Sequence, residues 1–255
     1  FHMWVPDVYH GAPTSVAAFI GTAPKIAAVM FAFRILLTGF GEVHQYWAPM
    51  FAVLAVASLV VGNLAAIMQT NIKRMLAYST VSHMGFILLA FMAGSIGSTA
   101  GLYYAITYAL MAAVGFGILM VLSTDNIECE EIKDLAGLNQ RHAWFALLML
   151  LVMFSMAGIP PLMGFYAKFG VIMVLLKFHY VWLSVFAVVM SLIGAFYYLR
   201  VVKVMYFDEP THDQPIGSNY AAKFFLSVNA FLLVLWGVMP QTMIDWCAKA
   251  LENTL

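Results

Sequence analysis

The sequence predicts an all-α protein that crosses a membrane as a bundle of seven helices, one of them broken at mid-membrane. Its composition is 64% hydrophobic and only 9% charged, with a mean hydropathy of +0.90. Soluble domains carry roughly 25% charged residues, so this chain has too few charged groups to cover itself with a water-facing surface. Seven apolar runs are close to or longer than the ~20 residues that a transmembrane helix needs. The bilayer is therefore the expected solvent.

The apolar runs give the predicted elements in chain order. They lie near residues 16–37, 47–69, 75–94, 99–122, 143–177, 181–205 and 221–246. Two longer connections, 123–142 and 206–220, hold most of the acidic residues: Asp125, Glu128, Glu130, Glu131 and Asp134 in the first, and Asp208, Glu209 and Asp213 in the second.

The distribution of lysine and arginine predicts the orientation. We call side A the membrane face that carries the connections 70–74, 123–142 and 206–220. It receives Lys73, Arg74, Lys133, Arg141, Arg200, Lys203 and Lys223, whereas the opposite face receives only Arg34, Lys177 and Lys249. Basic residues concentrate on the cytoplasmic face of membrane proteins. Side A is therefore predicted to be cytoplasmic, with the C-terminus on the outer face.

The fifth run is abnormally long. As one helix it would have about 35 residues and measure roughly 52 Å at 1.5 Å per residue, against a hydrocarbon core of ~30 Å. Its middle contains two prolines and two glycines that favour a break: Gly158, Pro160, Pro161 and Gly164. Proline removes a backbone donor and clashes with the preceding turn. Broken helices of this kind mark ion sites in transporters. A simple proline kink is the alternative.

Two basic residues lie inside the predicted spans, Lys25 in the first and Lys168 just after the break. A charge near the bilayer centre costs at least ~2.5–3.5 kcal/mol on insertion scales, so such residues normally serve a water-filled path or a proton relay. Desolvation disfavours the charged form of lysine, which can then release its proton, whereas arginine cannot. The alternatives are a structural ion pair for Lys25 and a side chain extended to the outer interface for Lys168. No acidic residue of the sequence lies at a matching depth in the predicted spans.

His83, about two turns into the third predicted span, is a third candidate for the relay. Histidine titrates between pH 5 and 8. The neighbouring hydroxyls of Ser79, Thr80 and Ser82 could hold ordered water. A neutral histidine satisfied by a nearby hydroxyl or carbonyl explains the same pattern.

Several classes of function are not supported by the sequence. The formal net charge is zero, which gives no indication of a nucleic-acid partner. Cys129 and Cys247 form no CxxC pattern, which argues against an iron–sulfur cluster, haem attachment or structural metal site in this chain. The sequence opens at Phe1 without a signal-peptide pattern, and we expect that further residues precede it.

Three stretches carry a family resemblance. They are 1–14, FHMWVPDVYHGAPT; 69–85, with QTNIKRMLAYS and SHMG; and 157–169, with AGIPP, GF and KF. In this order they closely resemble the antiporter-like membrane subunits of NADH:quinone oxidoreductase, respiratory complex I.

The resemblance implies a fold of fourteen core helices with two inverted five-helix repeats, of which this chain would supply helices 8–14. Residues 1–45 would be a loop and the last helix of the first repeat, 46–206 the second repeat, and 207–255 a loop and the C-terminal helix. Lys25 would be the central relay lysine, Lys168 the terminal one, and His83 the link between them.

The implied activity is proton translocation driven by quinone reduction elsewhere in a complex of the bacterial inner membrane. The chain itself would hold no cofactor, because NADH, flavin, iron–sulfur clusters and quinone belong to partner subunits. The expected partners are other membrane subunits of the complex, lipid, protons and water. Two alternatives are a subunit of a multi-component cation/proton antiporter and a helical scaffold whose lysines only pair with neighbouring groups.

Overall fold

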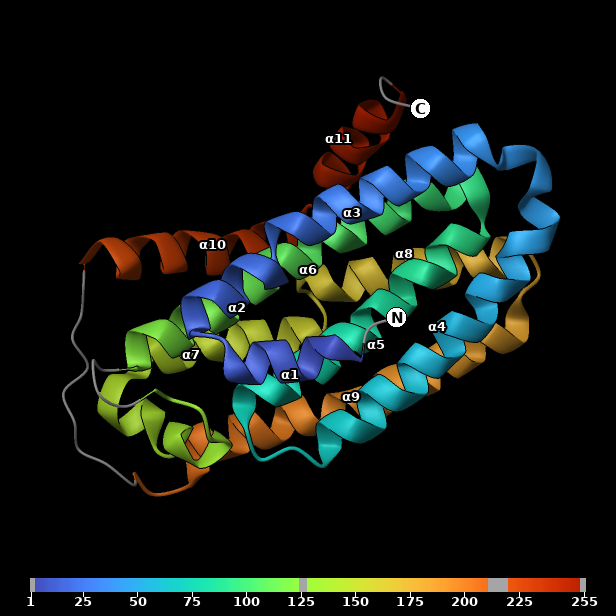
Figure 1. Cartoon of the computed structure of the whole chain (residues 1–255). Helices are drawn as coiled ribbons and strands as arrows, with labels where there is room; N and C mark the ends of the chain where they lie inside the picture. Colours follow the sequence, from blue (N-terminus) through green and yellow to red (C-terminus); the bar gives the residue numbers. More distant parts are fainter. Residues whose placement is uncertain (1–2, 124–127, 211–219, 253–255) are drawn as a thin grey trace.

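The computed structural model describes residues 3–123, 128–210 and 220–252, and helices dominate all three stretches (Figure 1). The helices are α1 Trp4–Gly11, α2 Thr14–Gly21, α3 Ala23–Arg34, η1 Ile35–Gly39, η2 Gly41–Val43, α4 His44–Ile67, α5 Ile72–Met92, α6 Gly94–Leu122, η3 Ile132–Leu135, α7 Leu138–Ala157, α8 Met163–Lys177, α9 Val181–Phe207, α10 Tyr220–Val238 and α11 Pro240–Glu252. Within these three stretches, seven helical segments are long and apolar enough to cross a membrane, which confirms the predicted helix bundle. The residues Phe1, His2, Asp125 and Asp213 of the sequence argument lie outside the described residues.

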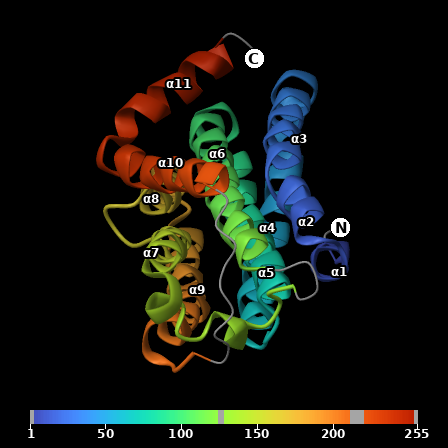
Figure 2. The same ribbon diagram turned by 90° about the vertical axis from the view of Figure 1, so that its left-hand side faces the viewer.

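Helices α5 and α6 form the centre of the bundle. Of the seven candidate spans, α5 is the most buried and α10 the least. Helix α6 has α2 and α3 on one side and α10 and α11 on the other (Figure 2). The hydroxyls of Ser79, Thr80 and Ser82 and the ring of His83 all lie on α5 and are buried. The polar groups of the spans are therefore concentrated where protein covers them.

Close packing of α4 against α5 depends on small residues. A Cβ atom at Gly62 would lie 2.6 Å from the backbone nitrogen of Ser82. Glycine at this position lets the two backbones approach closely, as in other membrane helix pairs.

The fifth predicted span is interrupted, as the sequence predicts. Helix α7 ends at Ala157 and α8 begins at Met163, so the break lies over 158–162. Gly158 takes a left-handed conformation with φ +89°, which favours glycine. Gly164 lies so close to α7 that a Cβ atom would fall 1.9 Å from the carbonyl oxygen of Ser155.

The first predicted span, 16–37, is wrong as a single helix. The structure divides it at Thr22, which has φ −118° and ψ −97°, into α2 and α3. Pro24 explains the division, because its ring would clash with the carbonyl four residues earlier and it donates no hydrogen bond. Lys25 therefore lies in the first turn of the helix that follows a break, and Lys168 lies in the second turn of the helix that follows the other break.

The last predicted span, 221–246, is also wrong in its extent. Helix α10 ends at Val238, and a separate helix, α11, begins at Pro240. Proline is well tolerated in the first turn of a helix, but not in its interior. Helix α11 buries Met243, Cys247 and Leu251 and has polar residues elsewhere on its surface, so it packs on the bundle by one face.

Candidate functional site

Lys25 is held by aromatic rings. Its ammonium nitrogen Nζ donates a hydrogen bond of 2.8 Å to the hydroxyl Oη of Tyr9 in α1. The same nitrogen lies 4.6 Å from the centre of the Tyr108 ring and 5.3 Å from that of the Tyr9 ring, which are distances for cation–π attraction. Within residues 3–123, 128–210 and 220–252, Lys25 forms no ion pair. The hydrogen-bond partner of Lys25 among the described residues is therefore a phenol.

A cavity of about 290 Å³ lies beside Lys25, between α3, α4 and α5. Its lining is apolar except for Lys25 and Ser58. The hydroxyl of Ser58 is buried and has no hydrogen-bond partner among the described residues. One side of the Lys25 site is therefore open space, in contrast to the packed side formed by Tyr9 and Tyr108.

His83 is the most completely enclosed of the three candidates. The side chain is buried in α5, with Nδ1 at 2.8 Å from Tyr104 Oη and Nε2 at 3.0 Å from Tyr198 Oη. A neutral imidazole has one donor and one acceptor nitrogen, so one tyrosine donates to the ring and the other accepts from it. The hydroxyl of Tyr198 also bonds to Ser79. Hydroxyls therefore surround His83 on both sides.

Lys168 is bound at the end of the broken helix. It lies in α8, is 7% exposed, and donates two hydrogen bonds of 2.9 Å, to the carbonyl oxygen of Ala157 and to Ser191 Oγ. Ala157 is the last residue of α7, and its carbonyl belongs to the negative end of the helix dipole, which attracts a cation. A Cβ atom at Gly158 would lie 3.0 Å from Lys168 Cδ. The ammonium group therefore points into the bundle, and the alternative of a side chain extended to the outer interface is wrong.

Aromatic side chains join the three candidates. The ring of Tyr108, next to Lys25, lies 5.0 Å from the ring of His83. On the other side, Tyr104 stacks on Phe86 at 5.6 Å, and Lys168 Nζ lies 5.6 Å from the centre of the Phe86 ring. Side-chain contacts thus run from Lys25 through His83 to Lys168. Among the described residues, the hydrogen bonds at these three positions form separate groups.

None of these tyrosines is among the site residues that the sequence predicts. A usable signal was present in α6, where Tyr104 and Tyr108 are four residues apart and so share a helix face. No comparable spacing connects Tyr9 to Lys25 or Tyr198 to His83, because α1 and α9 reach the site only through the tertiary fold.

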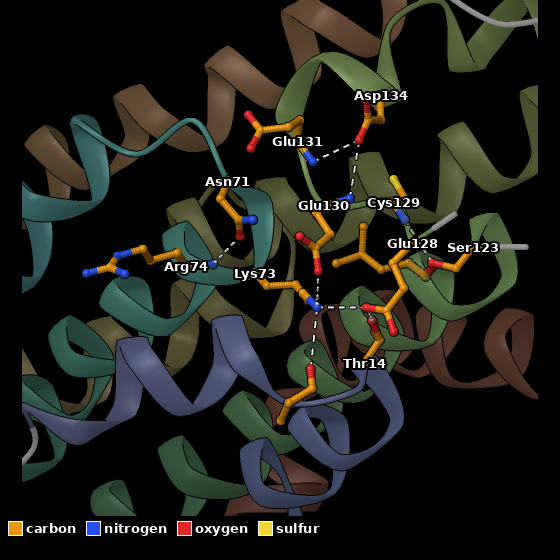
Figure 3. A network of polar contacts seen from close by, with 12 residues as sticks. Thr14, Asn71, Lys73, Arg74, Ser123, Glu128, Cys129, Glu130, Glu131 and Asp134 are labelled. Carbon is orange, nitrogen blue, oxygen red and sulfur yellow. Dashed lines mark hydrogen bonds and ion pairs between the residues drawn. The ribbon is translucent and has the colours of Figure 1, made fainter. Parts of the chain in front are cut away.

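A second charged cluster, at side A, centres on Lys73 (Figure 3). The sequence placed this lysine among the basic residues at the ends of spans, but its side chain is only 1% exposed. Its Nζ lies 2.7 Å from Glu128 Oε2 and 2.7 Å from Glu130 Oε1. The hydrogen bond from Lys73 holds the pKa of Glu128 below its usual value. The cluster therefore places a buried lysine between two partly exposed glutamates.

The fold and the enclosed lysines define a class, the antiporter-like polytopic membrane proteins. A family profile described as NADH:quinone oxidoreductase/Mrp antiporter, TM, matches residues 1–194, and the chain belongs to this family. The predicted resemblance is thereby confirmed.

The curated relatives that match the chain include several subunits N of NADH-quinone oxidoreductase. The chain is 80% identical over 256 residues to NADH-quinone oxidoreductase subunit N of Neisseria gonorrhoeae, covering 100% of this chain and 53% of the relative. It is 55% identical over 260 residues to the subunit N of Laribacter hongkongensis, again covering 100% and 53%. The chain thus spans about half the length of the curated relatives it matches.

Solved structures share the fold. A chain of respiratory complex I from Thermus thermophilus with bound aureothin superposes with a TM-score of 0.80 and 29% identity, covering 96% of this chain and 54% of that one. A chain of the Mrp complex from Dietzia superposes with a TM-score of 0.88, covering 99% and 55%, at 21% identity, which establishes likeness of fold alone.

Proposed function

We propose that this chain is the C-terminal part of a proton-translocating membrane subunit of NADH:quinone oxidoreductase, with Lys25, His83 and Lys168 as its relay groups. The observation that carries the proposal is the placement of three titratable side chains inside one helix bundle, joined by Tyr108, Tyr104 and Phe86. The members of this family translocate cations or protons. Proton translocation therefore explains why three titratable side chains are joined inside one bundle, which packing alone does not explain.

The partners of the two lysines suit proton transfer. Tyr9, Ser191 and the carbonyl of Ala157 are neutral, so they can bind an ammonium group without fixing its charge as a carboxylate would. Hydroxyls both donate and accept, which lets a proton enter and leave the same group. His83, between two hydroxyls, can exchange a proton at either ring nitrogen. Water between the separate hydrogen-bonded groups would complete the route.

The proposed setting is the inner membrane of a bacterium, with side A cytoplasmic and the C-terminus on the outer face. Other membrane subunits of the complex would be the neighbours. NADH, flavin, iron–sulfur clusters and quinone would reside in partner subunits, and quinone reduction there would drive the relay. We further propose that 46–206 forms one five-helix repeat, with 1–45 and 207–255 flanking it.

A subunit of a multi-component cation/proton antiporter is the second candidate, because the matching family profile includes the Mrp antiporters. The 80% identity to a subunit N favours the first candidate. Sodium-dependent proton movement without NADH oxidation would favour the second.

The test is proton pumping by membrane vesicles that carry Lys25→Ala or Lys168→Ala in the full-length subunit. NADH oxidation and the amount of assembled complex are measured in the same preparations. Lys203→Ala is the matched control, because Lys203 is 67% exposed and pairs with Asp208 at side A. Assembled complexes that lose pumping in both variants but not in the control would support the relay. Normal pumping in both variants would refute it, and failed assembly would favour the scaffold.

A further inference from the structure

The Lys73 cluster, formed by Lys73, Glu128 and Glu130, takes no part in the proposed relay. The ammonium group of Lys73 nevertheless has a full set of hydrogen-bond acceptors. An ammonium group has three donor hydrogens. Lys73 Nζ has three acceptors, Glu128 Oε2 and Glu130 Oε1 at 2.7 Å each and the carbonyl oxygen of Ala12 at 3.4 Å. A lysine that only marks the cytoplasmic face would extend into water, whereas this side chain is 1% exposed. Membrane orientation alone therefore does not explain the lysine at position 73.

The cluster connects to the Lys25 site through α1. Arg74, the next residue, pairs with Asp7 of α1 at 3.2 Å, and Lys73 reaches Ala12 just after that helix. Between these two attachments lies Tyr9, fully buried, which accepts the hydrogen bond of Lys25. Lys73 and Arg74 therefore fix the helix that supplies the partner of Lys25.

A second connection reaches the helix that follows α1. Thr14, the first residue of α2, donates a hydrogen bond of 3.1 Å to Glu128 Oε2, the same oxygen that Lys73 binds. Helix α2 leads through the break at Thr22 directly to Lys25. The start of the Lys25 helix is thus attached to the cluster as well.

A third connection runs toward Lys168. The backbone of Ile72 donates to the carbonyl of Glu130 at 2.6 Å, and Ile132 donates to the carbonyl of Thr70 at 2.9 Å. These two bonds join the start of α5 to the segment that leads through η3 into α7. Helix α7 ends at Ala157, whose carbonyl binds Lys168.

We infer that Lys73 is a positioning residue for proton translocation, which through Glu128, Glu130 and α1 holds Tyr9 on Lys25 and sets the Lys25 helix against the helix that binds Lys168. The inference rests on the proposed function. Its basis is that one buried cation touches, directly or through its two glutamates, all three segments on which the proposed relay depends. Lys73 itself carries no proton along the route.

The experiment is a double-mutant cycle in the full-length subunit, in vesicles that contain the assembled complex. The variants are Lys73→Met, Tyr9→Phe and the double substitution, with Lys203→Met as the exposed control. The readouts are the proton-to-electron ratio and the coupled rate, both per assembled complex, so that loss of assembly alone does not move them. Coupling between two sites appears as non-additivity. Glu128→Gln, which leaves Lys73 paired with Glu130, provides a milder variant where Lys73→Met fails to assemble.

The expected result is a coupled rate that falls severalfold in Lys73→Met and in Glu128→Gln, with Lys203→Met unchanged. The double variant falls no further than the more severe single variant, and Lys73→Arg restores most of the rate. The inference is overturned if the variants reduce only the amount of complex, or if the losses of Lys73→Met and Tyr9→Phe multiply. Should Lys25→Ala and Lys168→Ala both pump normally, the proposed function itself fails. If Lys25→Ala stops pumping while the Lys73 and Glu128 variants match the control, this inference alone fails.

Discussion

Two regions of the molecule bury lysine in different ways. Inside the bundle, Lys25 and Lys168 bind a phenol, a serine hydroxyl and a backbone carbonyl. At side A, Lys73 lies between two carboxylates, each at 2.7 Å. All three side chains belong to the same chain and lie on or beside the same central helices. The difference is in the charge of the partners.

This difference predicts what each lysine can do. Opposite charges nearby favour the charged form of a lysine. Loss of that charge would leave the carboxylates uncompensated, so two glutamates keep Lys73 charged in the folded protein. Neutral partners stabilise the ammonium group far less, and the apolar surroundings favour the uncharged form. Lys25 and Lys168 are therefore suited to changing protonation, and Lys73 to holding segments in place.

Replacing lysine by arginine should separate the two regions most clearly. Arginine keeps its charge and does not deprotonate. We expect Lys168→Arg to reduce pumping by at least about tenfold, since positioned acid–base groups contribute roughly 10²–10⁴-fold. Lys73→Arg should retain most of the activity, because only its charge is required. Pumping per assembled complex is the measurement, and equal losses in both variants would contradict the comparison.

Gly158 offers a test of how the backbone prepares the Lys168 site. Alanine there must adopt φ +89° and would bring its Cβ to 3.0 Å from Lys168 Cδ. Such a backbone conformation costs about 1–3 kcal/mol for a residue other than glycine. We expect lower thermal stability and severalfold slower pumping. Gly170→Ala is the control, since its Cβ would meet its nearest neighbour at 3.9 Å. A Gly158→Ala complex indistinguishable from this control would exclude the proposed role of the break.

The two hydroxyls at His83 should have smaller effects. Tyr104→Phe and Tyr198→Phe each remove one hydrogen bond to the imidazole of His83, but each keeps the aromatic ring of the substituted residue. A single hydrogen bond contributes about 0.5–1.5 kcal/mol, which corresponds to roughly a 2- to 13-fold change in rate. The coupled rate per complex is the readout. If both variants pump at the full rate, His83 is better explained as a packed, neutral side chain.

The smallest effect should be the pH dependence of the Lys73 cluster. Hydrogen bonding to Lys73 lowers the pKa of Glu128, so its stabilising contribution is present above its unfolded pKa and disappears as the pH falls through the lower, folded pKa. The expected size is about 1 kcal/mol or less, because Glu128 is 41% exposed. The difference in melting temperature between the unmodified complex and Glu128→Gln should therefore shrink on acidification below about pH 4.5. A difference that grows on acidification would contradict the assignment.

The sequence alone predicted the number of spans and the interruption near Pro160 and Pro161, because hydropathy and proline act locally. It missed the break at Thr22, where Pro24 lies near the start of a run that is apolar throughout. It also extended the last span through Pro240, since the apolar pattern of α11 continues on only one of its faces. Local composition reports where helices can form but not always where tertiary packing ends them.

At the site, the sequence singled out Lys25, His83 and Lys168, because charged or titratable groups stand out against an apolar background. Their partners were mostly hidden. Tyr9 and Tyr198 are joined to the site by contacts across 16 and 115 positions of the chain, which no spacing rule anticipates. The burial of Lys73 was hidden for the same reason, because its glutamates lie 55 and more positions away.

We propose that Lys25 and Lys168 change protonation during turnover while Lys73 does not. Infrared difference spectroscopy of the complex with nitrogen-15-labelled lysine, with and without NADH, would test it directly. We expect a lysine ammonium signal that decreases in Lys25→Arg and Lys168→Arg complexes and is unchanged in Lys73→Arg. A signal that survives in both relay variants, or disappears only in Lys73→Arg, would contradict it.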